Sequence, residues 1–293
     1  VSKSYLSALF GIAVDEGLID SIDDKVSKYL DDFDGTGYEN VKIKNLLQMS
    51  SGIEFNEDYA DPGSDINRFA RATARGSSFR DFAKTLKNGR EQGTYNHYVS
   101  LDTQVLGMIL ESVTDMPLRE YLYKRIWSKI GTESEAYYIA DNTGTDMALG
   151  GLNASLRDFA KFGHMLLLDG IWEGSNQKYS SYVDLIKNLN AYGLQFWTIC
   201  ARPQSNCEES IVSTIGFDGQ YIMIDFERNI VVVRASLYAP IQNLSQDRKM
   251  KLNPNNLSQS NWIATVPNAI GASMRNESPN ISAFYSLILD SIN

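Results

Sequence analysis

The chain has 293 residues, of which 43% are hydrophobic, so it is long enough for one large domain or two closely packed ones. Its formal net charge is -9 and its pI is about 4.8, and an acidic surface of this kind argues against nucleic acid or an anionic membrane as a partner. No apolar run approaches the roughly 18 residues that a membrane helix needs. Because the chain opens without an initiating Met or a signal-peptide pattern, and inside a helical pattern, we expect it to be an incomplete chain.

The first predicted element is a buried helix over residues 1–17, where Gly17 ends the apolar run. Lys3 lies in its first turn, where a cation is poorly placed for the helix dipole. Taken alone, this position favours a solvated terminal lysine. The alternative is a catalytic lysine, which requires a serine three residues earlier, immediately before Val1. The N–H of that serine would lie at the helix N-terminus, where an oxyanion can bind.

The middle of the chain is predicted to be mostly helical. Apolar residues at helical spacing predict helices over 41–49, 79–86, 100–113 and 118–130. Another helix follows Ser155, which has the position of an N-cap, with Asp158 three residues on as the acidic partner of a capping box. Residues 54–78 are polar and turn-rich, and the pattern predicts loop there.

The last third of the chain changes character after Tyr192. Short β-rich runs separated by turn residues predict strands, and a helix closes the chain; the ranges are 194–199, 211–214, 220–226 and 229–237 for the strands and 282–292 for the helix. Residues 225–229 are predicted to form a hairpin loop. This order predicts an α/β fold with an antiparallel β-sheet flanked by helices, plus a mostly helical subdomain.

The two cysteines, Cys200 and Cys207, enclose a short polar interval between two of the predicted strands. A disulfide that closes a hairpin loop and a pair of free thiols are both compatible with this spacing. A disulfide would favour a periplasmic or secreted protein, and free thiols a cytoplasmic one. With two histidines in the whole chain, we expect no metal site.

The catalytic motifs that are missing narrow the search. The chain has no Gly-x-Ser-x-Gly elbow, no phosphate-binding glycine loop, no His-Glu-x-x-His and no Cys-x-x-Cys, and its first residue has no nucleophilic side chain. Three stretches remain: the helical turn with Lys3, the loop with Tyr98 and Ser100, and the strand edge at 213–222, which two glycines interrupt. On spacing alone, Tyr98 is most simply a half-buried aromatic side chain.

These stretches resemble the serine β-lactamase/penicillin-binding-protein superfamily, and most closely its branch of class C β-lactamase-like esterases and 6-aminohexanoate-dimer hydrolases. Val1-Ser2-Lys3-Ser4 is similar to the Ser-x-x-Lys motif of that family without its first residue. Tyr98-Val99-Ser100 is similar to the Tyr-x-Ser form of the second motif. Supporting similarities extend over most of the chain, at residues 43–52, 150–163, 219–220 and 231–233.

The resemblance implies a division of the chain into two structural parts, and a catalytic base for the nucleophilic serine. Residues 1–20 with 190–293 would form an α/β sheet domain that lacks its N-terminal strands, and residues 21–189 a mostly helical subdomain. The serine expected before Val1 would attack an ester or amide carbonyl, with Lys3 as its base, and no cofactor or metal would be needed. Tyr98 would deliver the proton to the leaving group.

Two further roles follow from the same resemblance. Ser100 would extend the hydrogen-bond network in place of the usual Asn. The oxyanion would be held by the N–H of the serine and by the backbone N–H of Phe217, while Gly216 keeps the strand edge open. Where β-lactamases and penicillin-binding proteins carry Lys-Thr-Gly, this chain has Thr214-Ile215-Gly216-Phe217, without the cation that holds a β-lactam carboxylate. Ile215 with Gly216 resembles the amide hydrolase and esterase branch instead. The resemblance therefore favours an esterase or amidase with a small-molecule ester or amide substrate.

Two alternatives are carried with this hypothesis. One is a β-lactamase or a penicillin-binding D,D-peptidase, and the other is a catalytically inactive homologue that acts as a binding protein. The residue before Val1 separates the second from an enzyme, because any residue other than serine removes the nucleophile. Tyr59 and Trp197 are candidate aromatic walls of the substrate site, although packing is the simpler role for each. The sequence sets neither the natural substrate nor the oligomeric state.

Overall fold

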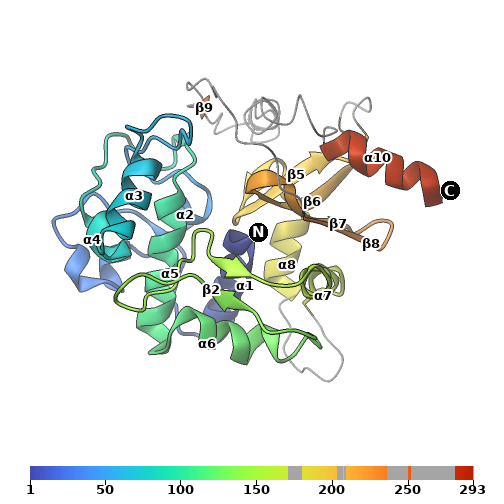
Figure 1. The fold of residues 1–293 in the computed structure, drawn as a ribbon, viewed down its shortest axis with the longest axis horizontal. Coiled ribbons are helices and arrows are strands. Elements are labelled where there is room, and N and C mark those ends of the chain that lie inside the picture. The colour runs from blue at the N-terminus through green and yellow to red at the C-terminus, as the bar shows by residue number, and fades with distance from the viewer. Residues whose placement is uncertain (171–179, 203–206, 208, 236–249, 252–280, 293) are drawn as a thin grey trace.

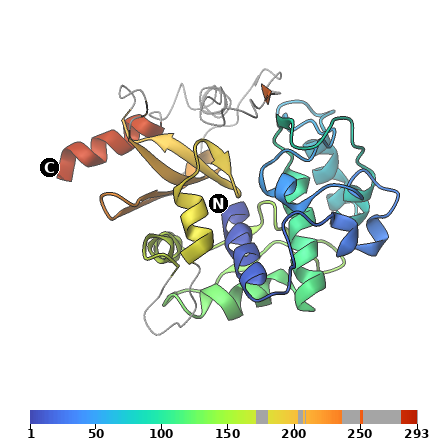
Figure 2. The same ribbon diagram turned by 180° about the vertical axis from the view of Figure 1, so that it is seen from behind.

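The computed structural model describes residues 1–170, 180–202, 207, 209–235, 250–251 and 281–292. Within these residues, a group of helices lies beside a five-stranded antiparallel sheet, and the N-terminus lies where the two meet (Figures 1 and 2). This mixed arrangement of helices and an antiparallel sheet is the predicted fold class. The first turn of the chain is therefore placed at a boundary between two structural parts.

The helical part is built around α1 (Ser2–Asp15) and α5 (Ser100–Thr114), two largely buried helices that pack against each other. Both are apolar on more than one face, which suits helices that have neighbours on several sides. The other helical elements here are η1 (Val26–Lys28), η2 (Asp31–Phe33), α2 (Ile43–Leu47), α3 (Asp65–Ala74), α4 (Phe79–Lys84), α6 (Leu118–Leu122) and η3 (Tyr123–Trp127). Short strand pairs join β1 (Tyr95–Asn96) to β9 (Met250–Lys251) and β2 (Tyr137–Tyr138) to β3 (Leu152–Asn153).

The sheet has the strand order β4-β5-β6-β7-β8, and every neighbouring pair is antiparallel. Its strands are β4 (Tyr192–Gly193), β5 (Phe196–Cys200), β6 (Ser210–Gly216), β7 (Gln220–Asp225) and β8 (Ile230–Arg234), with η4 (Phe217–Gly219) between β6 and β7. The helices beside it are α7 (Leu156–Leu167), α8 (Ser180–Lys187) and α10 (Ile281–Ile292).

Alternating side chains of β7 fill the two faces of the sheet, as the period of two in a strand requires. Ile222 and Ile224 belong to the large core that includes residues of α7 and α8. Tyr221 and Met223 belong to a smaller core with α10. Figures 1 and 2 show α10 on the face of the sheet opposite to α7 and α8. The sheet is thus covered by helices on both faces.

The structure confirms the predicted helix cap and hairpin, and it shows the state of the two cysteines. The Ser155 hydroxyl oxygen accepts from the backbone N–H of Asp158 at 3.2 Å, and the same hydroxyl donates to the Asp158 carboxylate at 2.8 Å. These two bonds fix the start of α7. The β7–β8 hairpin turns at Asn229, whose φ of 57° is one that asparagine tolerates better than most residues. Cys200 and Cys207 form a disulfide, which decides between the two alternatives left by the sequence.

Two local predictions are wrong in part. Residues 54–78 are not all loop, because α3 occupies residues 65–74, with the Ser64 hydroxyl accepting from the N–H of Asn67 at its start. Residues 118–130 do not form one helix, since α6 passes into the π-helical η3, which ends at Trp127. The strand predicted over 229–237 is β8, and residues 236–237 lie outside the described residues.

Two properties of the described residues bear on partners. None of their helices is both long and apolar enough to cross a membrane. In the same residues, His, Cys, Asp and Glu side chains do not gather in groups of three or more that could hold a metal ion.

Candidate active site

Lys3 extends from the first turn of α1 into the boundary between the helices and the sheet. Its Nζ donates to the backbone carbonyl of Leu149 at 2.8 Å and to the hydroxyl oxygen of Ser100 at 3.1 Å. Burial lowers the pKa of Lys3 to about 8, although the carboxylates of Glu57 and Asp102 act in the opposite direction. The interpretation of Lys3 as a solvated terminal lysine is therefore wrong.

Ser100 is the first residue of α5, so its backbone N–H has no partner within the helix. A carboxylate accepts that N–H: Oε2 of Glu57 lies 2.9 Å from it, and Oε1 of Glu57 accepts the Ser100 hydroxyl in a short hydrogen bond. The Tyr59 hydroxyl donates to the same Oε1 at 3.0 Å. Burial raises the pKa of Glu57, an effect that the Lys3 charge and these hydrogen bonds partly offset. Glu57 thus joins Ser100 and, through it, Lys3.

Tyr98 lies beside the lysine, with its ring centroid 5.3 Å from the Lys3 Nζ. Its ring also packs at 6.1 Å from that of Trp197 and at 6.2 Å from that of Tyr192. Burial, and then the charge of Glu57, raise the pKa of Tyr98 well above its usual value. The phenol therefore carries its proton at neutral pH. Tyr98 is a packed aromatic side chain and a neighbour of Lys3 at the same time.

The end of β6 lies against the start of α1. A Cβ added at Gly216 would lie 3.4 Å from Cγ2 of Val1 and 2.9 Å from Cβ of Gln220, so there is little room for a side chain at this position. Ile215 packs against the apolar cluster of Ala191 and Trp197, which Tyr98 also contacts.

Phe217 is 58% exposed, and its ring centroid lies 5.0 Å from that of Tyr59, which is 45% exposed. The hydroxyl of this same Tyr59 donates to Glu57. Through these contacts the six predicted site residues gather in one region of the molecule: Lys3, Tyr98, Ser100, Ile215, Gly216 and Phe217.

Two carboxylates of the site have no sequence motif of their own. Glu57 lies in the polar stretch after residue 54, and its partner Ser100 is 43 residues further along the chain. Asp102, in the first turn of α5, is fully buried and accepts from the Tyr38 hydroxyl at 3.0 Å, and burial raises its pKa well above the usual value. It is therefore more than a surface acid that complements the helix dipole. Nε2 of His97 lies 2.7 Å from the Phe55 carbonyl oxygen.

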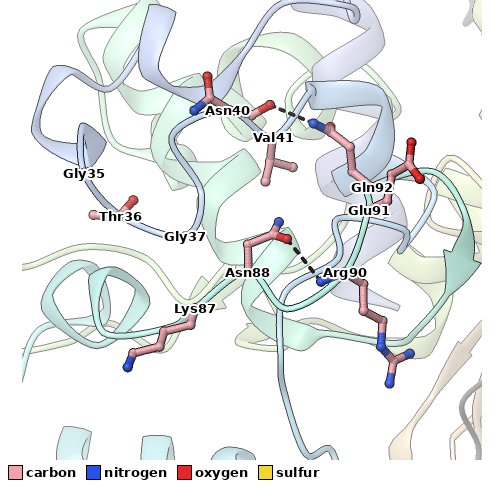
Figure 3. A pocket seen from close by; sticks show the side chains of 10 residues that line it. All are labelled: Gly35, Thr36, Gly37, Asn40, Val41, Lys87, Asn88, Arg90, Glu91 and Gln92. Atoms are coloured by element: carbon pink, nitrogen blue, oxygen red, sulfur yellow. Dashed lines mark hydrogen bonds between the residues drawn. The ribbon is translucent and has the colours of Figure 1, made fainter.

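A surface cavity lies apart from these groups (Figure 3). It has a volume of about 620 Å³ and is lined by Gly35, Thr36, Gly37, Asn40, Val41, Lys87, Asn88, Arg90, Glu91 and Gln92. Gln92 Nε2 donates to the Asn40 carbonyl and so joins two walls of the cavity. The Arg90 N–H donates to the Asn88 side chain within one wall. None of the residues around Lys3 lines this cavity.

Comparison with known proteins places the chain in a family. The model of the Beta-lactamase family matches residues 1–237, so the chain belongs to the Beta-lactamase family. This confirms the superfamily that the Lys3 and Tyr98 motifs indicated. The 6-aminohexanoate-dimer hydrolase of Paenarthrobacter ureafaciens is 29% identical to it over 260 residues, which cover 80% of this chain and 64% of the relative. The chain thus spans less than two thirds of the length of that relative.

Solved structures show the same fold. One from Bacillus anthracis, provisionally assigned as a 6-aminohexanoate-dimer hydrolase, superposes with a TM-score of 0.71 at 24% identity, over 94% of this chain and 71% of that chain. The class C beta lactamase from Rhodobacter sphaeroides superposes with a TM-score of 0.62 at 14% identity, over 100% of this chain and 84% of that one. At these identities the likeness establishes the β-lactamase fold alone.

Proposed function

We propose that this protein is a serine hydrolase that cleaves an ester or amide bond of a small molecule through an acyl-enzyme intermediate. The serine expected immediately before Val1 is its nucleophile, one helical turn from Lys3. The observation that carries the proposal is the state of Lys3. Its Nζ is held by the Leu149 carbonyl and the Ser100 hydroxyl beside the Tyr98 ring, and burial lowers its pKa to about 8, so that it is neutral more often at neutral pH than an ordinary lysine.

The proposed acylation involves three proton transfers. The serine hydroxyl gives its proton to Lys3 while its oxygen bonds to the carbonyl carbon of the substrate. Tyr98 gives its proton to the leaving alcohol or amine as the C–O or C–N bond breaks, and it is reprotonated by Lys3. In deacylation, water attacks the acyl carbon and gives a proton to Lys3, while Tyr98 gives its proton to the serine oxygen as the acyl bond breaks; Lys3 then reprotonates Tyr98. Tyr98 holds its proton at rest, and because its raised pKa makes it a weak acid, it gives the proton up only as negative charge develops on the leaving group.

The oxyanion of the tetrahedral intermediate is assigned to two backbone donors, the N–H of the serine and the N–H of Phe217. Support comes from the contact between Gly216 and Val1, which brings the end of β6 to the first turn of α1. One such donor lowers the barrier by about 3 kcal/mol. The edge strand is therefore as important to the proposed reaction as the base.

The choice of esterase or amidase over β-lactamase rests on the third motif, which has no cation. In the third motif, Thr214-Ile215-Gly216 stands in place of Lys-Thr-Gly, so the uncharged Thr214 replaces the lysine, and the apolar Ile215 packs beside Trp197. By analogy with the 29% identical relative, the first amide to test is a 6-aminohexanoate dimer.

The experiment is to express the full-length protein, identify the residue before Val1, and measure its reaction with nitrophenyl esters, the 6-aminohexanoate dimer and a labelled penicillin. We expect ester or amide turnover, and covalent labelling by a fluorophosphonate on the peptide that contains Ser2 and Lys3. A serine-to-alanine variant at the position before Val1 is the control and should abolish both. Trapping or turnover of penicillin without ester hydrolysis would favour the D,D-peptidase or β-lactamase alternative. A residue other than serine before Val1 would favour the inactive binding protein.

The proposal also sets the sign of the pH dependence. Lys3 accepts a proton only when it is neutral, and its pKa is about 8. We therefore expect kcat/KM to rise with pH and to reach half of its plateau near pH 8. A profile that falls as pH passes from 6 to 8 would contradict the role of Lys3 as a base.

A further inference from the structure

The Glu57 carboxylate is the hydrogen-bond acceptor for three groups of the site. It accepts the backbone N–H of Ser100 at 2.9 Å, the Ser100 hydroxyl, and the Tyr59 hydroxyl at 3.0 Å. A carboxylate with three donors is held in one orientation and is strongly solvated by the protein. None of the family motifs that the sequence shows includes this residue.

The bond from Ser100 to Glu57 decides what Ser100 offers to Lys3. A hydroxyl has one hydrogen and two lone pairs, and the hydrogen of Ser100 is directed to the carboxylate. Its lone pairs are therefore the groups that Lys3 meets at 3.1 Å, and Lys3 is the donor in this contact.

The direction of the bond from Lys3 to Ser100 decides where the lone pair of the neutral Lys3 amine is free. A neutral amine has two hydrogens and one lone pair. The contacts with Ser100 and with the carbonyl of Leu149 use both hydrogens, so the lone pair remains to take the proton of the nucleophile. If Ser100 turned its hydroxyl hydrogen toward Lys3, it would occupy that lone pair, and the amine would no longer act as a base.

The charge of Glu57 acts on Lys3 as well. The charged and titratable groups around Lys3 are the carboxylates of Glu57 and Asp102 and the Tyr98 phenol. The two carboxylates raise the pKa of Lys3, Glu57 more than Asp102, while burial lowers it. The Tyr98 phenol is uncharged at neutral pH.

We propose that Glu57 is a positioning residue: it fixes the Ser100 hydroxyl as an acceptor for Lys3 and sets the pH at which Lys3 becomes a base. This inference rests on the proposed function. It explains how a serine can serve at the second position after Tyr98, in the Tyr-x-Ser form of the motif. The short side chain of serine needs a second group to orient it, and the carboxylate of Glu57 supplies that orientation.

The test is E57Q in the full-length protein, with E54Q as the matched control. Glu54 is exposed and lies three residues earlier on the same stretch, outside the Lys3 network. Gln removes the negative charge and can donate a hydrogen bond to Ser100 instead of accepting one. We expect the midpoint of the kcat/KM profile to move down by roughly one pH unit and the plateau to fall about tenfold. E54Q should match the parent in both.

E57D keeps the charge and separates the two effects. It should keep the midpoint of the parent while its plateau falls, because the shorter side chain loses the geometry but not the sign of the charge. Thermal melting of all the variants shows that each is folded. An E57Q midpoint that coincides with that of the parent overturns the inference, whatever the rate. An inactive parent protein contradicts the proposed function instead, so the two failures are distinguishable.

Discussion

The two sides of the candidate active site are built differently. The base side consists of Lys3, Ser100 and Glu57, whose polar groups bond to one another within the boundary between α1 and α5. The edge side consists of the end of β6 and η4, where Phe217 is largely exposed. A lysine becomes a base only where water is scarce, whereas an oxyanion donor must stay open to the substrate. A site of this kind therefore needs a buried part for the base and an exposed part for the oxyanion donor, and the two parts must adjoin.

The largest expected effect is on the base side. K3M keeps the apolar stem of Lys3 and removes the amine, and we expect kcat/KM to fall by roughly 10³- to 10⁴-fold, at the upper end of acid–base catalysis. K129M is the control, because Lys129 is exposed and outside the site. Steady-state hydrolysis of a nitrophenyl ester measures both. Activity within tenfold of the parent in K3M would remove Lys3 from the mechanism.

Y98F tests the proton donor that lies between the two sides. The phenylalanine ring keeps the contacts with Trp197 and Tyr192 but has no proton to deliver, so we expect a fall of roughly 10²- to 10³-fold. The loss should be greater for an amide than for an activated nitrophenyl ester, since the latter leaves without a proton. Y123F, at an exposed tyrosine, is the matched control. Equal losses on the two substrates would show that Tyr98 is not the proton donor.

On the edge side, F217P and F217A separate the backbone from the side chain. Phe217 begins η4, and Gly216 before it is extended, with φ of -108° and ψ of 161°, so a proline fits at 217 and removes the N–H. We expect kcat to fall about 10²-fold in F217P, as for the loss of one oxyanion donor. F217A keeps the N–H, and its effect should be below tenfold. If alanine is as damaging as proline, the contact of the ring with Tyr59 is what counts.

The smallest effect on activity is expected at the disulfide. Cys200 pairs with Ser210, at the end of β6 opposite to Gly216, so the bridge lies away from both sides of the site. The C200S/C207S variant should lose about 2 kcal/mol of free energy of unfolding, as for a short loop, while its kcat/KM stays near that of the parent. Urea unfolding and ester hydrolysis of the same sample measure the two quantities. A large loss of activity in a folded sample would show that the bridge reaches the edge side.

The sequence predicts the parts of this protein that rest on local patterns. The helix with Lys3, the helix that begins at Ser100 and the cap at Ser155 each follow from residues that are neighbours along the chain. Helix α3 does not, because only Ile66 and Phe69 of its residues are buried, which is too short an apolar pattern to stand out. The division into a domain of residues 1–20 with 190–293 and one of 21–189 stays a prediction, as do the catalytic roles.

Glu57 shows where local patterns end. Its three donors come from Tyr59 and from Ser100, and the latter is brought near by the packing of α5 rather than by spacing in the chain. A carboxylate in a polar stretch has no sequence signal that separates it from its neighbours Glu54 and Asp58. The burial that lowers the pKa of Lys3 is likewise a property of the assembled fold.

Gly216 allows a short separation between the end of β6 and the start of α1. Because residue 216 has no Cβ, the end of β6 can approach Val1 and Gln220 closely. The absence of this side chain therefore allows the short separation between the strand edge and the start of α1. An alanine at 216 would press first on Gln220, the nearer neighbour, and so would displace the turn that carries Phe217. The gap between the proposed oxyanion donors would then widen from the sheet side, while the first turn of α1 stayed in place.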